Sequence, residues 1–317
     1  MSATPARAIV FAYHDVGVRC LRAVLDAGIE VPLVVTHRDA PSETIWFGSV
    51  EAVAAEHGLH CVTPDDPHTP ELLALAQQAA PDFLFSFYYR QMLRSPWLTL
   101  PRRGAFNMHG SMLPAYRGRA PVNWAVIHGE RETGATLHRM NEKPDNGAIV
   151  DQQAVPILGD DTAHEVFAKV VVAAELVLVR SLPKLLDGSA VEIVQDLSRG
   201  AYFGGRRPED GRIPPQATAA QVHDLVRALA PPYPGAFLHL GGSQVFIDRT
   251  RHAGPGPRAS EPSISLHSDG EHLWLQTADG GRLQVLAARS ADGSPLDAST
   301  FIQRFGDGPV AADASAS

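Results

Sequence analysis

The sequence predicts an α/β protein with two domains: a Rossmann-like domain built on a parallel sheet, followed by a small β-barrel. The first half of the chain alternates apolar runs with amphipathic stretches, whereas short alternating segments fill the last hundred residues. A length of 317 residues is about twice that of one domain. With 44% apolar and 20% charged residues, the composition excludes a disordered, collagen-like or coiled-coil protein.

The first elements give the alternation. The apolar run from Ala8 to Tyr13 predicts a strand, and Val18, Leu21, Val24 and Leu25 follow at helical spacing. The pattern continues with strands at 31–36 and 83–88 and helices at 49–57 and 70–80. Strands separated by helices predict a parallel sheet with right-handed crossovers.

The rest of the first domain, which we place at residues 1–193, is less regular. We expect a short strand from Gly104 to Met108, a helix at 122–128, and strands at 133–140 and 148–155. The apolar stretch 162–186 predicts a long helix. Its candidate caps are Asp160, Asp161 and Thr162, and it ends near Gly188. Asp160, Asp161, His164 and Glu165 fit a helix cap better than a metal site.

Glycine and proline crowd the next segment, which predicts a linker at residues 194–215. Residues 216–310 then form the second domain, with a helix at 218–230 and short strands at 236–240, 244–248, 272–276 and 283–288. Short strands at close spacing predict a small β-barrel, OB-like in type. The small residues of 311–317 predict a disordered tail.

Charge and cysteine content exclude several classes of protein. The 27 basic and 35 acidic residues give a net charge of −8, which argues against nucleic acid as the partner. No apolar run approaches the roughly 18 residues of a membrane span, and no signal segment begins the chain, so we expect a cytoplasmic protein without membrane insertion. Cys20 and Cys61 have no metal-ligand spacing, and we expect no metal.

Chemistry concentrates after the strand that ends near Met108. The turn after the first strand, residues 12–17, lacks the G-x-G-x-x-G spacing of dinucleotide sites, so the carboxyl ends of other strands become the default site. Asn107 and His109 are two apart, which puts an amide donor and a proton shuttle on one strand face. This pair suits acyl transfer through a tetrahedral intermediate. Asp145, between two predicted strands, is a candidate to orient the imidazole.

The segment from Asn107 to Gly118 matches N-x-H-x-S-x-L-P-x-Y-R-G, the signature of enzymes that use 10-formyltetrahydrofolate. The chain therefore resembles the folate-dependent formyltransferases. Residues 11–15, 85–90, 118–124 and 133–140 most resemble the formyltransferase domain of the bifunctional polymyxin-resistance proteins of the ArnA type. The likeness is strong to about residue 160 and looser beyond it. It implies formylation of the 4-amino group of UDP-4-amino-4-deoxy-L-arabinose, for lipid A modification.

The resemblance also implies roles for residues. Asn107 corresponds to the family's transition-state stabiliser, His109 to its proton donor, and Asp145 to the residue that raises the histidine pKa. The implied folate contacts are Gln91, Met92, Leu93, Arg119, Asn141, Glu142, Lys143, Pro144 and Asp145. Arg117, with Arg119, could hold a folate tail or a diphosphate, or cap nearby carbonyl groups. His138 fits a packed, hydrogen-bonded histidine better than a ligand.

Two departures from the family pattern matter. The start of the family's second domain reads Phe203-Gly204-Gly205-Arg206-Arg207 here, so substrate contacts in the linker are not carried over. The bifunctional proteins continue into an NAD-dependent decarboxylase, whereas this sequence ends at Ser317. We therefore expect formyl transfer alone and a separate decarboxylase chain in the pathway. The sequence gives no signal for the oligomeric state, and a homo-oligomer is compatible with it.

Other functions stay open. A methionyl-tRNA formyltransferase would be expected to carry a basic insertion after the second strand, but residues 36–44 are short and not basic. The acceptor could instead be another nucleotide-linked amino sugar, including a dTDP-linked one. A purine-pathway enzyme would have a phosphate-binding glycine loop, which is missing. A formyl hydrolase or a non-catalytic folate or sugar-nucleotide sensor are the remaining alternatives.

Overall fold

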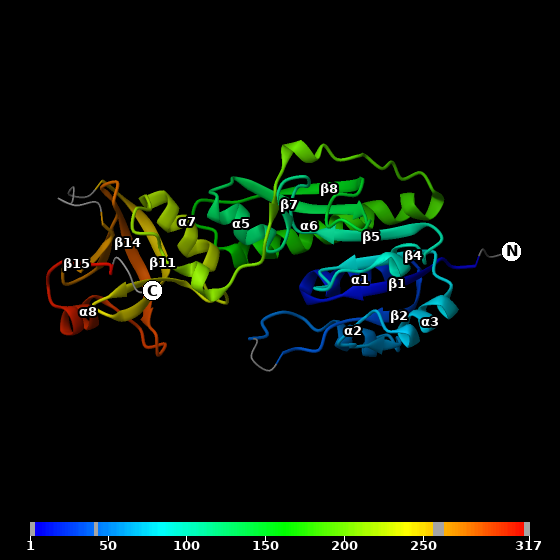
Figure 1. Ribbon diagram of the computed structural model, residues 1–317, viewed down its shortest axis with the longest axis horizontal. Helices are drawn as coiled ribbons and strands as arrows, with labels where there is room; N and C mark the ends of the chain where they lie inside the picture. The colour runs from blue at the N-terminus through cyan, green and yellow to red at the C-terminus, as the bar shows by residue number, and fades with distance from the viewer. Residues whose placement is uncertain (1–3, 41–43, 256–262, 314–317) are drawn as a thin grey trace. The chain divides into compact units, whose positions relative to one another are not determined.

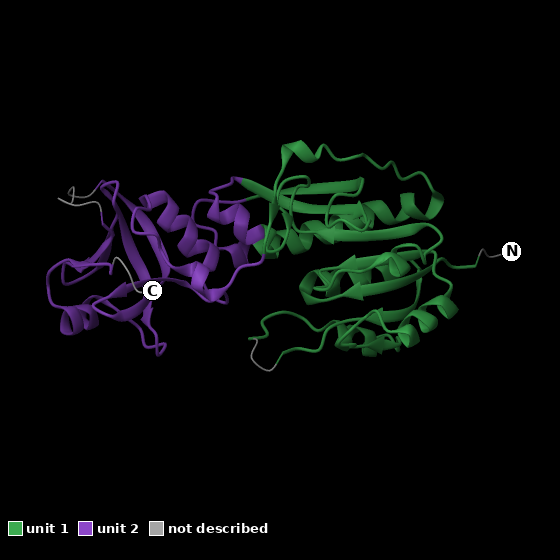
Figure 2. Ribbon diagram, viewed as in Figure 1, with its two compact units in different colours: residues 1–121, 132–156, 167–204 green, residues 122–131, 157–166, 205–317 purple. Residues whose placement is uncertain are grey.

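The computed structural model of the protein describes residues 4–40, 44–255 and 263–313. The chain divides into two compact units, coloured separately in Figure 2. Unit 1 comprises Met1–Pro121, Glu132–Pro156 and Phe167–Gly204, and unit 2 comprises Val122–Arg131, Ile157–Val166 and Gly205–Ser317. Unit 1 is an α/β domain and unit 2 is built on an antiparallel sheet, so the predicted fold class is confirmed.

Unit 1 contains a sheet in the order β3-β2-β1-β4-β5-β7-β8 (Figure 1). Its strands are β1 (Arg7–Ala12), β2 (Glu30–Val35), β3 (Cys61–Val62), β4 (Phe83–Phe87), β5 (Gly104–His109), β7 (Glu132–Arg139) and β8 (Ile149–Pro156). The first five pair in parallel, as predicted, but β7 runs antiparallel to both β5 and β8. A fully parallel sheet is therefore wrong at this edge, because residues 140–148 are too few for the crossover that a parallel pair needs.

Helices cover both faces of this sheet, which explains why the central strands are apolar throughout. They are α1 (His14–Asp26), α2 (Val50–Glu56), α3 (Pro70–Ala79), α4 (Ser95–Leu98) and α6 (Ala163–Asp187), the last of which begins in unit 2. Ser49 and Thr69 cap α2 and α3 by accepting the N–H groups of Ala52 and Leu72. At α6, Glu165 accepts from Thr162, which agrees with the predicted cap.

Unit 2 contains a six-stranded antiparallel sheet in the order β10-β11-β14-β13-β12-β15. The strands are β10 (Ala236–Leu240), β11 (Ser243–Pro255), β12 (Ser265–Ser268), β13 (Leu273–Gln276), β14 (Gly281–Ser290) and β15 (Val310–Ala311), and the helices are α5 (Pro121–Ile127), α7 (Ala219–Leu229) and α8 (Ala298–Phe305). The Asp313 N–H donates to the carbonyl oxygen of His239, which brings the chain after β15 to the opposite edge strand, β10. The sheet thus forms a nearly closed barrel.

Two segments differ from the sequence prediction. The tail expected to be disordered from residue 311 is ordered to Asp313, because β15 pairs with β12 and Asp313 binds β10; residues 314–317 lie outside the described residues. Residues 194–204, expected in a linker, belong to unit 1. They include the short 3-10 helix η1 (Leu197–Arg199) and the strand β9 (Tyr202–Phe203), which pairs with β6 (Arg117–Gly118). A second 3-10 helix, η2 (Pro208–Gly211), follows.

In the part of the chain that the structure describes, none of the helices combines the length and apolar character that a bilayer crossing needs.

Candidate active site

Strand β5 carries Asn107 and His109 at its carboxyl end, between β4 and β7. Asn107 lies opposite His138 of β7, and His109 lies opposite Thr136. Asn107 is half-buried and His109 is only 6% exposed. The strand therefore holds an amide and an imidazole in a site that is largely shielded from water.

Asp145 joins them from the connection between β7 and β8. Its Oδ1 lies 3.5 Å from His109 Nδ1 and 3.4 Å from His138 Nε2. Its Oδ2 accepts the Gly118 N–H at 2.8 Å. One largely buried carboxylate, 11% exposed, thus faces two imidazole rings and is held by a backbone donor.

The hydrogen bonds of His109 define its tautomer. Nε2 lies 2.8 Å from the carbonyl oxygen of Tyr116, which can only accept, so Nε2 carries a hydrogen and donates it. In the neutral ring, Nδ1 is then an acceptor that faces Asp145 Oδ1. A proton that arrives at Nδ1 would be stabilised by the carboxylate, so this nitrogen is the natural point of proton uptake.

His138 is packed and hydrogen-bonded, as expected, but it belongs to the same cluster. The ring is 2% exposed, and Nδ1 donates to the carbonyl oxygen of Arg139 at 2.9 Å. Nε2 lies 3.2 Å from Asn107 Nδ2, from which the neutral ring accepts. His138 therefore fixes the orientation of the Asn107 amide and leaves its second N–H to point elsewhere.

Burial and charge set the protonation of the cluster. Burial raises the pKa of Asp145, but His109, His138 and the Gly118 N–H outweigh it and hold the pKa at about 2. Burial lowers the pKa of His109, and His138 adds to this, while Asp145 and the Tyr116 carbonyl oppose it. The cluster therefore rests at neutral pH with an ionised Asp145 and a neutral His109.

The signature loop after β5 packs against residues 193–203, which we call the strap. Arg117 donates to the carbonyl oxygens of Leu197 and Gly200 in the strap, and therefore caps nearby carbonyl groups. The Arg119 N–H donates to the carbonyl oxygen of Phe203, and the rings of Tyr116 and Phe203 stack with centroids 5.1 Å apart.

The folate contacts that the resemblance implies lie on three segments: the loop after β4, the signature loop that packs against the strap, and the β7–β8 loop. After β4, Gln91 and Met92 are exposed and Leu93 is buried. The Gln91 side chain donates to the carbonyl oxygen of Asp65. Arg119 is exposed, as are Asn141, Glu142 and Lys143, whereas Pro144 and Asp145 are half-buried. The first half of the β7–β8 loop is thus exposed, whereas its second half, which carries Asp145, is held against the protein.

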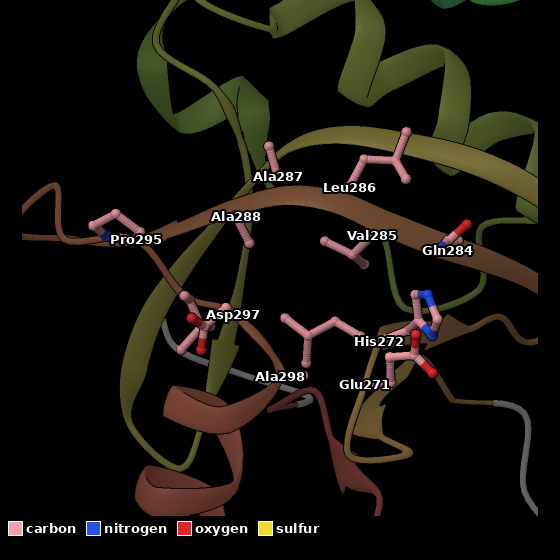
Figure 3. Close-up of a pocket in the computed structure, with 12 residues that line it drawn as sticks. Glu271, His272, Gln284, Val285, Leu286, Ala287, Ala288, Pro295, Asp297 and Ala298 are labelled. Carbon is pink, nitrogen blue, oxygen red and sulfur yellow. The ribbon is translucent and has the colours of Figure 1, made fainter.

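The described residues form a hollow in each unit, and neither is lined by Asn107, His109 or Asp145. One of about 210 Å³ is lined by residues including Tyr13, His37, Asp39 and Phe47, at the carboxyl ends of β1 and β2. This is the edge of an open α/β sheet at which ligands bind. The other, of about 430 Å³, lies in unit 2 along Val285–Ala288 of β14 (Figure 3).

The unit 2 hollow is lined mostly by apolar residues, together with Glu271, His272, Gln284 and Asp297. None of the predicted site residues lines it, and it has no paired amide and buried histidine, so we assign the chemistry to the β5 cluster. Among the described residues there is no group of three or more His, Cys, Asp or Glu side chains placed to hold a metal ion.

Comparison with protein families gives two matches. The family described as "Formyl transferase" matches residues 8–182, and the one described as "Formyl transferase, C-terminal domain" matches residues 206–306. The first match alone spans more than half of the chain and contains Asn107, His109 and Asp145.

Solved structures share the fold. WlaRD, a sugar 3N-formyl transferase crystallised with dTDP and 5-N-formyl-THF, is 18% identical, with a TM-score of 0.70 over 92% of this chain and 99% of its own. An N-formyltransferase from Helicobacter canadensis, in complex with folinic acid and dTDP-3-aminofucose, is 17% identical, with a TM-score of 0.68 over 89% and 99%. A sugar N-formyltransferase from Shewanella sp. FDAARGOS_354 is 22% identical, with a TM-score of 0.62 over 77% and 97%.

Proposed function

The chain belongs to the formyl transferase family, and on this premise we propose that it transfers the formyl group of 10-formyltetrahydrofolate to the amino group of a nucleotide-linked amino sugar. The observation that carries the proposal is the convergence of Asn107, His109 and Asp145 at the carboxyl end of β5, within the segment that matches the family.

The reaction needs one nucleophilic attack and one proton transfer. The amine nitrogen attacks the formyl carbon, and the C–N bond to N10 of the folate breaks when the tetrahedral intermediate collapses. The attacking nitrogen loses a proton and N10 gains one, which gives a formamide and tetrahydrofolate. No metal takes part in these steps.

Each residue of the cluster has a task that its contacts support. Asn107 donates an amide N–H to the oxygen that gains charge in the intermediate, while His138 holds the amide from its other side. His109 moves the proton between the two nitrogens, since its neutral ring can accept at Nδ1. Asp145 stabilises the imidazolium that results and stays ionised throughout.

Folate binding is proposed at Gln91, Met92, Leu93, Arg119 and the loop Asn141 to Asp145. These residues combine exposed polar groups with the apolar Met92, which is 54% exposed and suits a planar pterin ring. The structures of WlaRD and of the Helicobacter canadensis enzyme contain formylated folates, which supports a formylated folate as the donor here.

For the acceptor we propose UDP-4-amino-4-deoxy-L-arabinose, in lipid A modification and polymyxin resistance. Support comes from the resemblance of the Phe11–Asp15 and Phe85–Arg90 segments to the ArnA formyltransferase domain. A dTDP-linked amino sugar is the main alternative, because two similar structures contain dTDP or a dTDP-sugar. The net charge of −8 disfavours methionyl-tRNA.

A panel of acceptors tests the proposal. The purified protein is incubated with 10-formyltetrahydrofolate and, in turn, UDP-4-amino-4-deoxy-L-arabinose, dTDP-linked 3- and 4-amino sugars, methionyl-tRNA and water alone. Tetrahydrofolate is measured by absorbance and the formamide by mass spectrometry. We expect the UDP-sugar to give the highest kcat/KM, and higher turnover of a dTDP-sugar would correct the acceptor while keeping the reaction.

The His109→Ala variant serves as the control for catalysis by this site. It should lose roughly 10²-fold or more in kcat while still binding folate. Tetrahydrofolate released at the same rate with and without amine would identify a hydrolase. Folate binding without turnover of any acceptor would identify a sensor and refute the proposal.

A further inference from the structure

Gln195 of the strap lies behind the loop that carries Asp145. Its side-chain Nε2 lies 3.0 Å from the carbonyl oxygen of Asp145 and 2.6 Å from that of Gly147. The residue is 8% exposed, and all three residues belong to unit 1. A buried amide from a segment fifty residues away thus binds both sides of this turn.

The orientation of the Gln195 amide follows from its partners. A carbonyl oxygen can only accept, so the group that faces two of them must be the NH₂ end, which has two hydrogens to donate. The other end, Oε1, is buried and has no hydrogen-bond partner among the described residues. Burying an acceptor without a partner costs free energy, so any stabilisation that this side chain gives must come from its two donors.

The turn needs such support. Asp145 has φ of 54°, in the left-handed region that a side chain disfavours. The Gly118 N–H holds only the carboxylate end of Asp145, at Oδ2. The Gln195 bonds hold the backbone from which the carboxylate projects. The two bonds therefore help to hold the Asp145 backbone at the angle that directs the carboxylate toward His109.

We infer that Gln195 is a positioning residue for the proposed reaction: by binding the carbonyl oxygens of Asp145 and Gly147, it keeps the Asp145 carboxylate against His109. Gln195 contributes no atom to the reacting groups and acts only through the backbone that carries Asp145. This inference rests on the proposed function, and its experiment is chosen so that the two can fail separately.

A double-mutant cycle tests whether Gln195 acts through Asp145. Gln195→Met keeps the length and bulk of the side chain but has no donor. We expect kcat to fall about 10- to 100-fold, with a smaller change in the KM for folate, since small misplacements have effects of this size. In an Asp145→Asn background, Gln195→Met should have almost no further effect. Multiplication of the two losses in the double variant would overturn the inference.

A second readout needs no activity. NMR titration of the His109 ring, assigned by comparison with His109→Ala, reports how close the carboxylate lies, because Asp145, His138 and the Tyr116 carbonyl are the groups that face it. We expect the pKa of His109 to fall in Gln195→Met. The Asp145→Asn variant and the double variant should show the same His109 pKa as each other. An unchanged titration in folded Gln195→Met would overturn the inference, and absence of turnover in the wild type would refute only the proposed function.

Two further variants guard against a trivial loss of folding. Ser198→Ala removes a hydrogen bond to Asp196 in the same strap without touching the loop, and should keep wild-type kcat and titration. Gln195→Asn keeps the amide but is one methylene too short to bind both carbonyls, and should fall between wild type and Gln195→Met. A loss in Ser198→Ala equal to that of Gln195→Met would show a general effect of the strap and contradict the specific role.

Discussion

Asp145 Oδ1 lies between the rings of His109, the proposed proton shuttle, and His138. His138 in turn binds Asn107. A change of charge at any one of these residues is therefore felt by the others through contacts of 3.2 to 3.5 Å. Substitutions in the cluster have to be chosen so that charge, shape and donor capacity can be separated.

Asn107→Asp is expected to be almost inactive. The change keeps the shape but removes both amide hydrogens and adds a negative charge near Asp145. Loss of one such donor lowers kcat roughly 10²- to 10³-fold. Steady-state kinetics measure the loss, and Asn107→Ala, which removes the donor without adding charge, separates the two causes. Activity of Asn107→Asp near that of the wild type would exclude the role of the amide.

Asp145→Asn should move the pH profile as well as lower the rate. The ionised carboxylate favours the protonated ring of His109, so its removal lowers the histidine pKa still further below its ordinary value. The limb of the kcat/KM profile that reports protonated His109 should then shift toward acid. An unchanged profile with weaker folate binding alone would make Asp145 a binding residue.

The cluster was only partly predictable from the sequence. Asn107 and His109 share a strand and carry the family signature, so their spacing and resemblance single them out. His138 lies thirty-one positions away, opposite Asn107, and only the antiparallel β5–β7 pairing brings them together. Gln195 lies where no periodic pattern exists, and its role depends on a turn geometry that spacing cannot reveal.

At the scale of elements, the β7–β8 connection is packed tightly against β7. Gly147 has no room for a side chain, because a Cβ built there would overlap the carbonyl oxygen of Arg139. The same glycine offers its own carbonyl to Gln195. The loop is therefore fixed between the end of β7 and the strap, and its position cannot change without moving Asp145.

Gly147→Ala should consequently destabilise the protein and reduce activity together. Relief of the overlap requires a backbone shift, for which overpacking costs of about 1–3 kcal/mol are usual. Urea unfolding and kcat should be measured beside Gly159→Ala, a matched control in which the new Cβ meets nothing within 4 Å. Equal behaviour of the two variants would show that the loop tolerates displacement.

Element prediction succeeded where periodicity is strong. The strands β1, β2 and β4 and the helices α3 and α7 lie within a residue or two of the expected ranges. The β7 direction was missed because pattern alone does not report how neighbouring strands run. Short elements such as β9 and β15 were missed because two residues carry no period, and tertiary hydrogen bonds define them.

At the scale of the whole molecule, each unit contains a buried histidine whose pKa burial lowers. In unit 1 it is His109. In unit 2 it is His223 of α7, which is 4% exposed. His223 Nε2 donates to the Gly159 carbonyl oxygen, and Nδ1 accepts from the Thr250 hydroxyl. Both rings are neutral in the folded protein at neutral pH, while an unfolded chain protonates them near pH 6.5.

We therefore expect the free energy of unfolding to fall as the pH drops below about 6.5, since the unfolded chain then binds more protons than the folded one. Each histidine contributes at most about 1.4 kcal/mol per pH unit. Asp145 acts at lower pH: the stability that its carboxylate contributes is present above its unfolded pKa of 3.8 and is lost as the pH falls toward about 2.

Urea unfolding between pH 5 and 8 should show the slope in the wild type and a smaller slope in His109→Gln and in His223→Gln. The exposed His60→Gln controls for the loss of an imidazole. A wild-type slope in both buried variants would mean that neither ring is held neutral by the fold.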